Sequence, residues 1–343
     1  SYQEDIEKLK DCSRRTFSSL AHLARIRVGS IDVKIHRRCV EELRRVVEEH
    51  SLLVVGEPGV GKSGALHDLV EALEDEGRDF VYLAVDRLAA QSLGELRQEL
   101  GLEHDLIEVL MNWPGTRPAF LVIDALDAAR GEPVAKTTQD LIRTVIENNN
   151  RWRVVASIRK FDLRYGIEFQ ELFYGEPPTD FQDPEFQKIR HLNIPKLSDE
   201  ELNQIAPRAP ELHSLVTNAP EELRELLQVP FNLQLVAGLL GEGVTEDELT
   251  PIRTQLELLD RYWHYRVIQG GAYEALLRRV CNQMVKARTL RIDRSYVEEP
   301  ATSTYLDDLL RTQVLVEWQP SPTAKPDRYV LAFSHHVLFD YAV

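Results

Sequence analysis

The chain has 343 residues, of which 43% are hydrophobic and 28% charged, with 17 glycines and 17 prolines. This composition is typical of a folded soluble protein rather than of a disordered or fibrous chain, and the length predicts more than one domain. The formal net charge of −15 at pH 7 makes the surface as a whole repel phosphate backbones, so nucleic-acid binding is disfavoured.

The cysteines and the apolar segments indicate a cytoplasmic protein. Cys12, Cys39 and Cys281 lie far apart and lack the spacing of a disulfide framework or a zinc site. No segment approaches the roughly 20 apolar residues that a membrane span needs. The chain begins at Ser1 and ends within an apolar, helix-like run, so we interpret it as a piece of a longer protein.

In chain order, residues 1–50 predict a helical lead-in, and at residue 51 the pattern changes. The apolar run 51–56 predicts a strand buried on both faces, and the spacing of Leu66, Leu69, Val70 and Leu73 predicts a helix after it. Strands are expected at 80–85, 119–124, 151–158 and 191–194, with helices at 92–100, 104–111 and 138–150. This alternation predicts an α/β fold with a three-layer parallel sheet over residues 51–195, and the glycine-rich loop GEPGVGKS at 56–63 indicates that it is the sheet of a P-loop NTPase.

The rest of the chain is expected to be mostly helical. Residues 161–186 have no clean period and predict an irregular insertion. Helices dominate after Pro195, and Ser198 with Glu201 and Thr245 with Glu248 have the spacing of capping boxes. Near the end, a helix, two short β-like runs and a last helix suggest a winged helix. We therefore expect a helical lid over 196–250 and a winged-helix domain over 251–343.

The sequence GEPGVGKS at 56–63 matches the phosphate-binding pattern G-x-x-x-x-G-K-[ST] in full. Backbone N–H groups of such a loop surround a phosphate, Lys62 is expected to reach the outer phosphates, and the Ser63 hydroxyl is expected to bind Mg²⁺. The residues predicted to bind nucleotide here are Gly56, Glu57, Pro58, Gly59, Val60, Gly61, Lys62, Ser63 and Gly64.

Three further residues are candidates for catalysis. Asp124 ends an apolar strand, where its carboxylate is expected to hold Mg²⁺ through water. Asp127 is expected either to orient the attacking water or to cap the next turn. Arg159 ends another strand and is expected either to sense a γ-phosphate or to be a surface cation paired with acids.

The nucleotide is expected to be ATP rather than GTP. Residues 159–162 read RKFD, which resembles the guanine-reading NKxD of GTPases, but Arg159 cannot supply the amide of Asn. The acidic motif reads D-A-L-D where GTPases need D-x-x-G.

The order of these motifs resembles the STAND branch of AAA-like ATPases, and within it the NACHT-type proteins. LVIDALD fits the family's acidic motif, VPFNLQLVAGLL looks like its lid segment, and FSHHVLFDYAV looks like its winged-helix segment. The resemblance implies that Pro230 packs on the nucleotide and that His335 contacts the β-phosphate of ADP. Ala128 stands where the family often has Glu, which implies slow hydrolysis.

By resemblance, the chain is the switch of a signalling ATPase that uses ATP or ADP with Mg²⁺. The resemblance further implies self-association into a homo-oligomer on activation, effector and sensor regions elsewhere in the longer protein, and a role in bacterial antiphage defence. Two alternatives remain open. The first is an AAA-type ATPase that acts on DNA through its winged helix, and the second is a binding scaffold without turnover.

Overall fold

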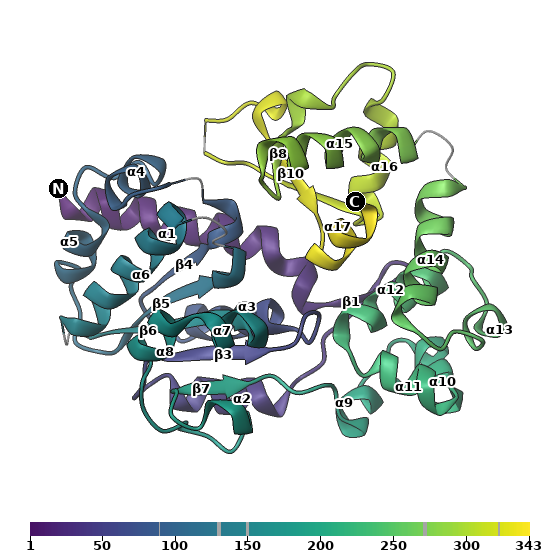
Figure 1. Ribbon diagram of the computed structural model, residues 1–343, viewed down its shortest axis with the longest axis horizontal. Coiled ribbons are helices and arrows are strands. Elements are labelled where there is room, and N and C mark those ends of the chain that lie inside the picture. The colour runs from purple at the N-terminus through teal and green to yellow at the C-terminus, as the bar shows by residue number, and fades with distance from the viewer. Residues whose placement is uncertain (89, 129–131, 149–150, 270–272, 322) are drawn as a thin grey trace. The chain divides into compact units, whose positions relative to one another are not determined.

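The computed structural model of the protein describes residues 1–88, 90–128, 132–148, 151–269, 273–321 and 323–343. The chain divides into two compact units (Figure 1). Unit 1 comprises residues 1–24 and 36–195, and unit 2 comprises residues 25–35 and 196–343. The chain therefore passes between the units three times, after residues 24, 35 and 195.

Unit 1 contains the predicted parallel sheet. Its strand order is β4 (Phe80–Ala84), β5 (Ala119–Asp124), β6 (Trp152–Arg159), β3 (Leu52–Gly56) and β7 (His191–Asn193), and all neighbouring strands are parallel. Every residue of β3 and β5 is buried, as their continuous apolar runs predict. The α/β fold class is confirmed. Because the strands are parallel, their carboxyl ends share one edge, where Arg159 lies beside Gly56 and Asp124 beside Ala84.

Helices cover both faces of this sheet. Alternate residues of β3 enter different cores: Leu52 and Val54 pack in one, and Leu53 and Val55 in the other. The first core contains α2 (Arg38–Val46) and α3 (Lys62–Asp75). The second contains residues of α4 (Leu93–Glu99), α5 (Leu106–Met111), α6 (Glu132–Glu147), α7 (Lys160–Tyr165) and α8 (Ile167–Leu172).

Helix α1 (Tyr2–Leu20) lies along β4, the strand at one end of the sheet. The Oγ of Ser13 accepts a hydrogen bond of 2.9 Å from the backbone N–H of Tyr82, and donates one of 2.8 Å to the carbonyl of Leu9. An edge strand otherwise presents unpaired backbone groups to other chains. The helix thus protects this edge of the sheet.

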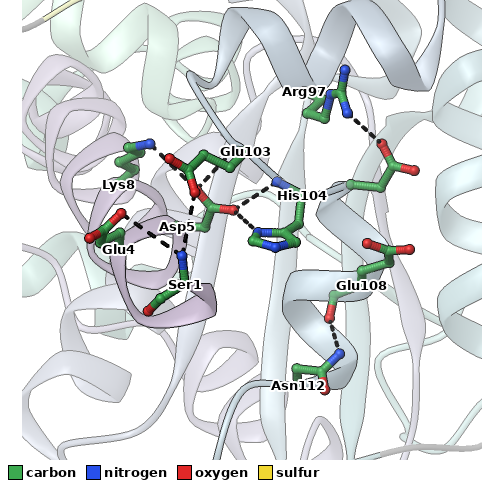
Figure 2. A network of polar contacts seen from close by, with 10 residues as sticks. Ser1, Glu4, Asp5, Lys8, Arg97, Glu103, His104, Glu108 and Asn112 are labelled. Atoms are coloured by element: carbon green, nitrogen blue, oxygen red, sulfur yellow. Dashed lines mark hydrogen bonds and ion pairs between the residues drawn. The ribbon is translucent and has the colours of Figure 1, made fainter.

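A buried carboxylate near the start of α1 fixes the helix to the loop between α4 and α5 (Figure 2). Asp5 accepts hydrogen bonds from the backbone N–H groups of Glu103 at 3.0 Å and His104 at 2.9 Å, and its side chain is fully buried. His104 Nδ1 lies 2.9 Å from the same carboxylate. Burial raises the pKa of Asp5, but these hydrogen bonds outweigh burial and bring it to about 2.

Two regions differ from the sequence predictions. Residues 1–50 are not helical throughout, because β1 (Ile26–Val28) and β2 (Ile31–Val33) form an antiparallel hairpin whose turn contains Gly29 at φ 60°. Residues 161–186 are not entirely irregular, since they include most of α7 and all of α8. Residues 149–150, the end of one predicted helix, lie outside the described residues.

Unit 2 begins with the β1–β2 hairpin and continues with helices. These are α9 (Asp199–Asn203), α10 (Pro210–Asn218), α11 (Glu221–Leu227), α12 (Pro230–Gly241), α13 (Glu246–Leu249) and α14 (Gln255–Trp263), which continues as a π-helix over His264–Ile268. The predicted capping boxes begin α9 and α13. In the first, Glu201 N donates to Ser198 Oγ at 3.2 Å and Ser198 N donates to the Glu201 carboxylate at 3.0 Å.

The last part of unit 2 has the elements of a winged helix. They are α15 (Tyr273–Ala287), β8 (Ile292–Asp293), α16 (Ser303–Arg311), β9 (Leu315–Trp318), β10 (Val330–Phe333) and α17 (His336–Ala342). The three strands form an antiparallel sheet in the order β8-β10-β9. The predicted boundary at residue 250 between lid and winged helix stays a prediction. Among the described residues, no helix has both the length and the apolar character needed to span a bilayer.

We predict that Asp5→Asn lowers the free energy of unfolding by about 2 kcal/mol at pH 7, the amount that corresponds to a folded-state pKa of about 2 against an ordinary 3.8. The folded-state pKa is depressed, so the contribution is complete above pH 3.8 and is lost as pH falls through about 2. Urea unfolding at pH 7 and at lower pH measures it. Glu4→Gln, at an exposed position one residue away, is the control and should leave the free energy of unfolding unchanged. If the unaltered protein, Asp5→Asn and Glu4→Gln have equal free energies of unfolding, the hydrogen bonds of Asp5 do not stabilise the fold.

Candidate nucleotide site

The glycine loop joins β3 to α3 at the carboxyl edge of the sheet. Gly61 precedes the first residue of α3 at φ 96°, a left-handed conformation that favours glycine. Gly64, in the first turn of α3, is required for a different reason, since a Cβ there would lie 2.6 Å from the carbonyl oxygen of Leu23. The strand, loop and helix occur in the order that the sequence predicts.

Lys62 folds back over the loop. Its Nζ donates hydrogen bonds to the carbonyls of Gly56 at 3.1 Å and Glu57 at 3.0 Å. Burial lowers the pKa of Lys62 to about 8, although the negative charges of Asp127 and Asp124 act in the opposite direction. The ammonium group is therefore held poorly solvated beside the loop, and an anion bound there would stabilise its charged form.

Asp124 lies at the end of β5 and is only 3% exposed. Burial raises the pKa of Asp124, while hydrogen bonds from Ser157 and Ser63 oppose that shift. Ser157, on β6, donates to Asp124 Oδ1 and accepts a hydrogen bond of 2.8 Å from the backbone N–H of Ala125. Ala125 has φ 59°, so the chain turns sharply here and Ser157 stabilises that turn.

Asp127 and Arg159 form an ion pair. Arg159 Nε lies 2.8 Å from Asp127 Oδ2, and the side chains are 19% and 6% exposed. The pair joins the turn after β5 to the end of β6, beside Gly56. The sequence predicts either an ion pair with an acid or a role at the γ-phosphate for Arg159, and the structure shows the ion pair. A role of Arg159 at the γ-phosphate stays a prediction. The choice between the two roles of Asp127 also stays open.

Three residues near the loop were missed by sequence reasoning. Besides Ser157, Arg37 donates to the carbonyl of the loop residue Val60 at 2.8 Å, and Lys160 Nζ lies 3.6 Å from Glu57 Oε1 and 2.6 Å from Asp183 Oδ2. None of them belongs to a sequence motif of the loop. Each is recognised only through its partner, which lies far away in the sequence.

The structure brings the two other predicted nucleotide-contacting segments together within unit 2. Pro230 is the first residue of α12, and the ring of the next residue, Phe231, stacks on His335 with centroids 4.2 Å apart. His335 Nδ1 accepts a hydrogen bond of 3.1 Å from Val337 N, so the neutral ring carries its proton on Nε2. Contact of Pro230 or His335 with a nucleotide stays a prediction, because the loop belongs to unit 1.

The oxygen donors at this site suit magnesium. The Ser63 hydroxyl lowers the pKa of the Asp124 carboxylate, so the two groups lie near each other. Mg²⁺ prefers oxygen ligands and is commonly held by one or two protein groups together with phosphates and water. Ser63 and Asp124 would therefore hold the ion, as the sequence predicts.

Comparison with known proteins identifies the domain. Residues 40–145 match the family model described as an AAA domain. The chain thus contains a P-loop NTPase domain, and this domain is of the AAA type, which implies nucleotide binding. No curated protein matches the sequence.

Solved structures with low sequence identity are similar to this chain. The ORC1 protein of Aeropyrum pernix, solved in complex with DNA, is 13% identical with a TM-score of 0.40, over 90% of this chain and 92% of that chain. Domain III of the replication initiation protein DnaA from Thermotoga maritima is 19% identical with a TM-score of 0.38, over 65% of this chain and 89% of that one. AMPPCP-bound DnaA from Aquifex aeolicus is 14% identical with a TM-score of 0.36, over 71% and 74%.

We predict that Ser157→Ala lowers the free energy of unfolding by about 1–3 kcal/mol, the cost of leaving buried polar groups unsatisfied. The substitution removes the hydroxyl that bonds to both Asp124 and Ala125 N. Chemical denaturation measures the change. Ser1→Ala is a control outside the site, and a Ser157→Ala protein as stable as that control would mean that the hydroxyl does not support the turn.

Proposed function

We propose that the protein binds ATP and ADP at the glycine loop and hydrolyses ATP slowly. The observation that carries this proposal is the arrangement at one sheet edge: a complete glycine loop with a poorly solvated Lys62 beside it, and Asp124 with Ser63 next to each other. Backbone N–H groups at the start of α3, aided by the helix dipole, and the Lys62 ammonium bind the phosphates.

The remaining residues supply charge and orientation. Bound Mg²⁺ would neutralise charge that develops on the phosphates. Asp124 would hold that ion from the sheet edge, and Arg159 would stabilise negative charge on the outermost phosphate. In this proposal the ion pair with Asp127 keeps the guanidinium in place until phosphate binds, and Asp127 then orients the water. Ala128, which offers no carboxylate, leaves water activation weak, so turnover stays below the roughly 1–100 s⁻¹ of efficient phosphoryl-transfer enzymes.

We predict that Lys62→Ala abolishes binding of ATP and ADP without unfolding the protein, since the loss of charge-assisted hydrogen bonds to phosphate costs several kcal/mol. Calorimetric titration of ADP measures affinity, and circular dichroism checks the fold. Lys10→Ala, which removes a half-exposed lysine paired with Glu7 on α1, is the matched control. Unchanged ADP affinity in Lys62→Ala would contradict the assignment of the site.

In the unaltered protein, ADP affinity should fall as pH rises through about 8, where Lys62 loses its proton.

We further propose that nucleotide identity sets a switch, as the resemblance to STAND and NACHT-type proteins implies. Pro230 and His335 are the residues proposed to contact ADP, and their segments already pack on each other through the Phe231 ring. A proton on Nε2 of His335 suits donation to a phosphate oxygen. ADP then favours a closed form, and exchange for ATP favours an open form that self-associates, in the setting of bacterial antiphage defence.

We predict that His335→Ala weakens the binding of ADP more than the binding of ATP, and shifts the protein towards the self-associating form. Loss of one hydrogen bond to a charged group, about 1.5–3 kcal/mol, corresponds to roughly one to two orders of magnitude in that equilibrium. Calorimetry with each nucleotide and light scattering measure the two effects. His336→Ala, at the next position, is the control. If His335→Ala has the same nucleotide affinities and the same mass distribution as the unaltered protein and His336→Ala, then His335 has no role in the switch.

A second candidate function is action on DNA through the winged helix. Residues 273–343 contain equal numbers of Lys plus Arg and of Asp plus Glu, in contrast to the net charge of −15 of the chain. The ORC1 structure named above holds DNA. However, α16, which precedes the β9–β10 hairpin, carries Asp307 and Asp308, and Arg311 pairs with Asp308 at 3.4 Å. A salt-dependent duplex titration decides: tight binding that weakens with salt supports the DNA function.

A further inference from the structure

Arg37 is a buried cation that lies outside the glycine-loop motif. It precedes the first residue of α2 and is 8% exposed. Its Nη1 donates a 2.8 Å hydrogen bond to the carbonyl of Val60, and its Nη2 donates a 2.5 Å hydrogen bond to the carbonyl of Pro195. Burial of a guanidinium is costly unless it is hydrogen-bonded, so these two carbonyls define where Arg37 is stable.

The bond to Val60 fixes the direction of the next N–H group of the loop. The carbonyl of Val60 and the N–H of Gly61 belong to one peptide unit, and the chain has no cis peptide bonds among its described residues. In a planar trans unit the C=O and N–H point in opposite directions. While Arg37 holds the carbonyl, the N–H of Gly61 must therefore point away from Arg37. The loop is bonded to Arg37 on its outer side, and this orients a backbone donor at the start of α3.

The second bond connects this loop peptide to the exits of the chain from unit 1. Pro195 is the last residue of unit 1 before the chain enters unit 2, and Arg37 lies one residue beyond the return from unit 2 at residue 35 to His36. The first crossing, after residue 24, also lies near the loop, since the Leu23 carbonyl closely approaches Gly64. All three crossings thus begin or end next to the phosphate loop or the first turn of its helix.

We propose that Arg37 is a positioning residue that couples phosphate binding in the loop to the chain crossings into unit 2. The proposal rests on nucleotide binding at the glycine loop. Phosphate binding requires the Gly61 N–H to keep its direction, so it favours the state in which Arg37 holds both Val60 and Pro195. A change of unit arrangement that pulls on residue 35 or 196 breaks this state and weakens phosphate binding, and by linkage the reverse also holds.

The test compares the unaltered protein with Arg37→Lys and Arg37→Gln. Lysine keeps the charge but lacks the fork that reaches two carbonyls, and glutamine keeps a neutral donor. Arg38→Ala removes an exposed arginine at the next position and is the matched control. Calorimetry measures ADP affinity, and small-angle X-ray scattering with and without saturating ADP measures the change of unit arrangement. We expect ADP affinity about tenfold weaker or more in both Arg37 variants, no scattering change at saturation, and unaltered behaviour in Arg38→Ala.

Hydrogen exchange on the unaltered protein tests the same proposal without a variant that has to fold. ADP should slow exchange in peptides covering 35–38 and 194–197, as well as in the loop. Absence of protection at these crossings, or Arg37 variants with wild-type affinity or a retained scattering change, would overturn the coupling while leaving the proposed function intact. A wild-type protein that binds no ADP would instead overturn the proposed function, and the coupling with it.

Discussion

The candidate site depends on mutual neutralisation of charges that the fold places in poorly solvated positions. Lys62 and Arg159 face Asp124 and Asp127 at the carboxyl edge of the sheet, in equal numbers. Removal of such charges from water is costly unless each finds an opposite charge or a hydrogen bond. Here the serine hydroxyls on Asp124 and the loop carbonyls on Lys62 supply the hydrogen bonds. A bound phosphate would give Lys62 a charged partner in place of neutral carbonyls, and Mg²⁺ would give Asp124 one, so ligand binding would strengthen the neutralisation of these charges.

The sequence predicts the elements of this site because each carries its own signal. A strand buried on both faces needs a continuous apolar run, and β3 and β5 have one. The glycine loop is recognisable because its conformation favours glycine at positions such as Gly61. Parallel strands with helices between them then bring Asp124 and Arg159 to one edge, so the candidate site follows from the order of elements alone.

What the sequence could not predict depends on partners that are distant along the chain. Ser157 is an ordinary serine inside a strand until β5 places Asp124 beside it, and Arg37 is one of two adjacent arginines until the loop folds over it. Short elements fail for a related reason. The hairpin at 26–33 and helices α7 and α8 are too short for a clear period, and exposed aromatic residues such as Phe161 and Tyr165, 64% and 67% exposed, obscure the pattern of a buried face.

The contacts described for the candidate site belong to two different units of the chain. The bonds of the loop to Arg37 and of Asp124 to Ser157 join residues of unit 1. The stacking of Phe231 on His335 lies within unit 2. The chain itself links the two units at the crossings after residues 24, 35 and 195. Because the crossings adjoin the loop, any force between the units acts on the peptides that must orient their N–H groups towards phosphate, and nucleotide affinity then depends on unit arrangement without a direct contact between distant side chains.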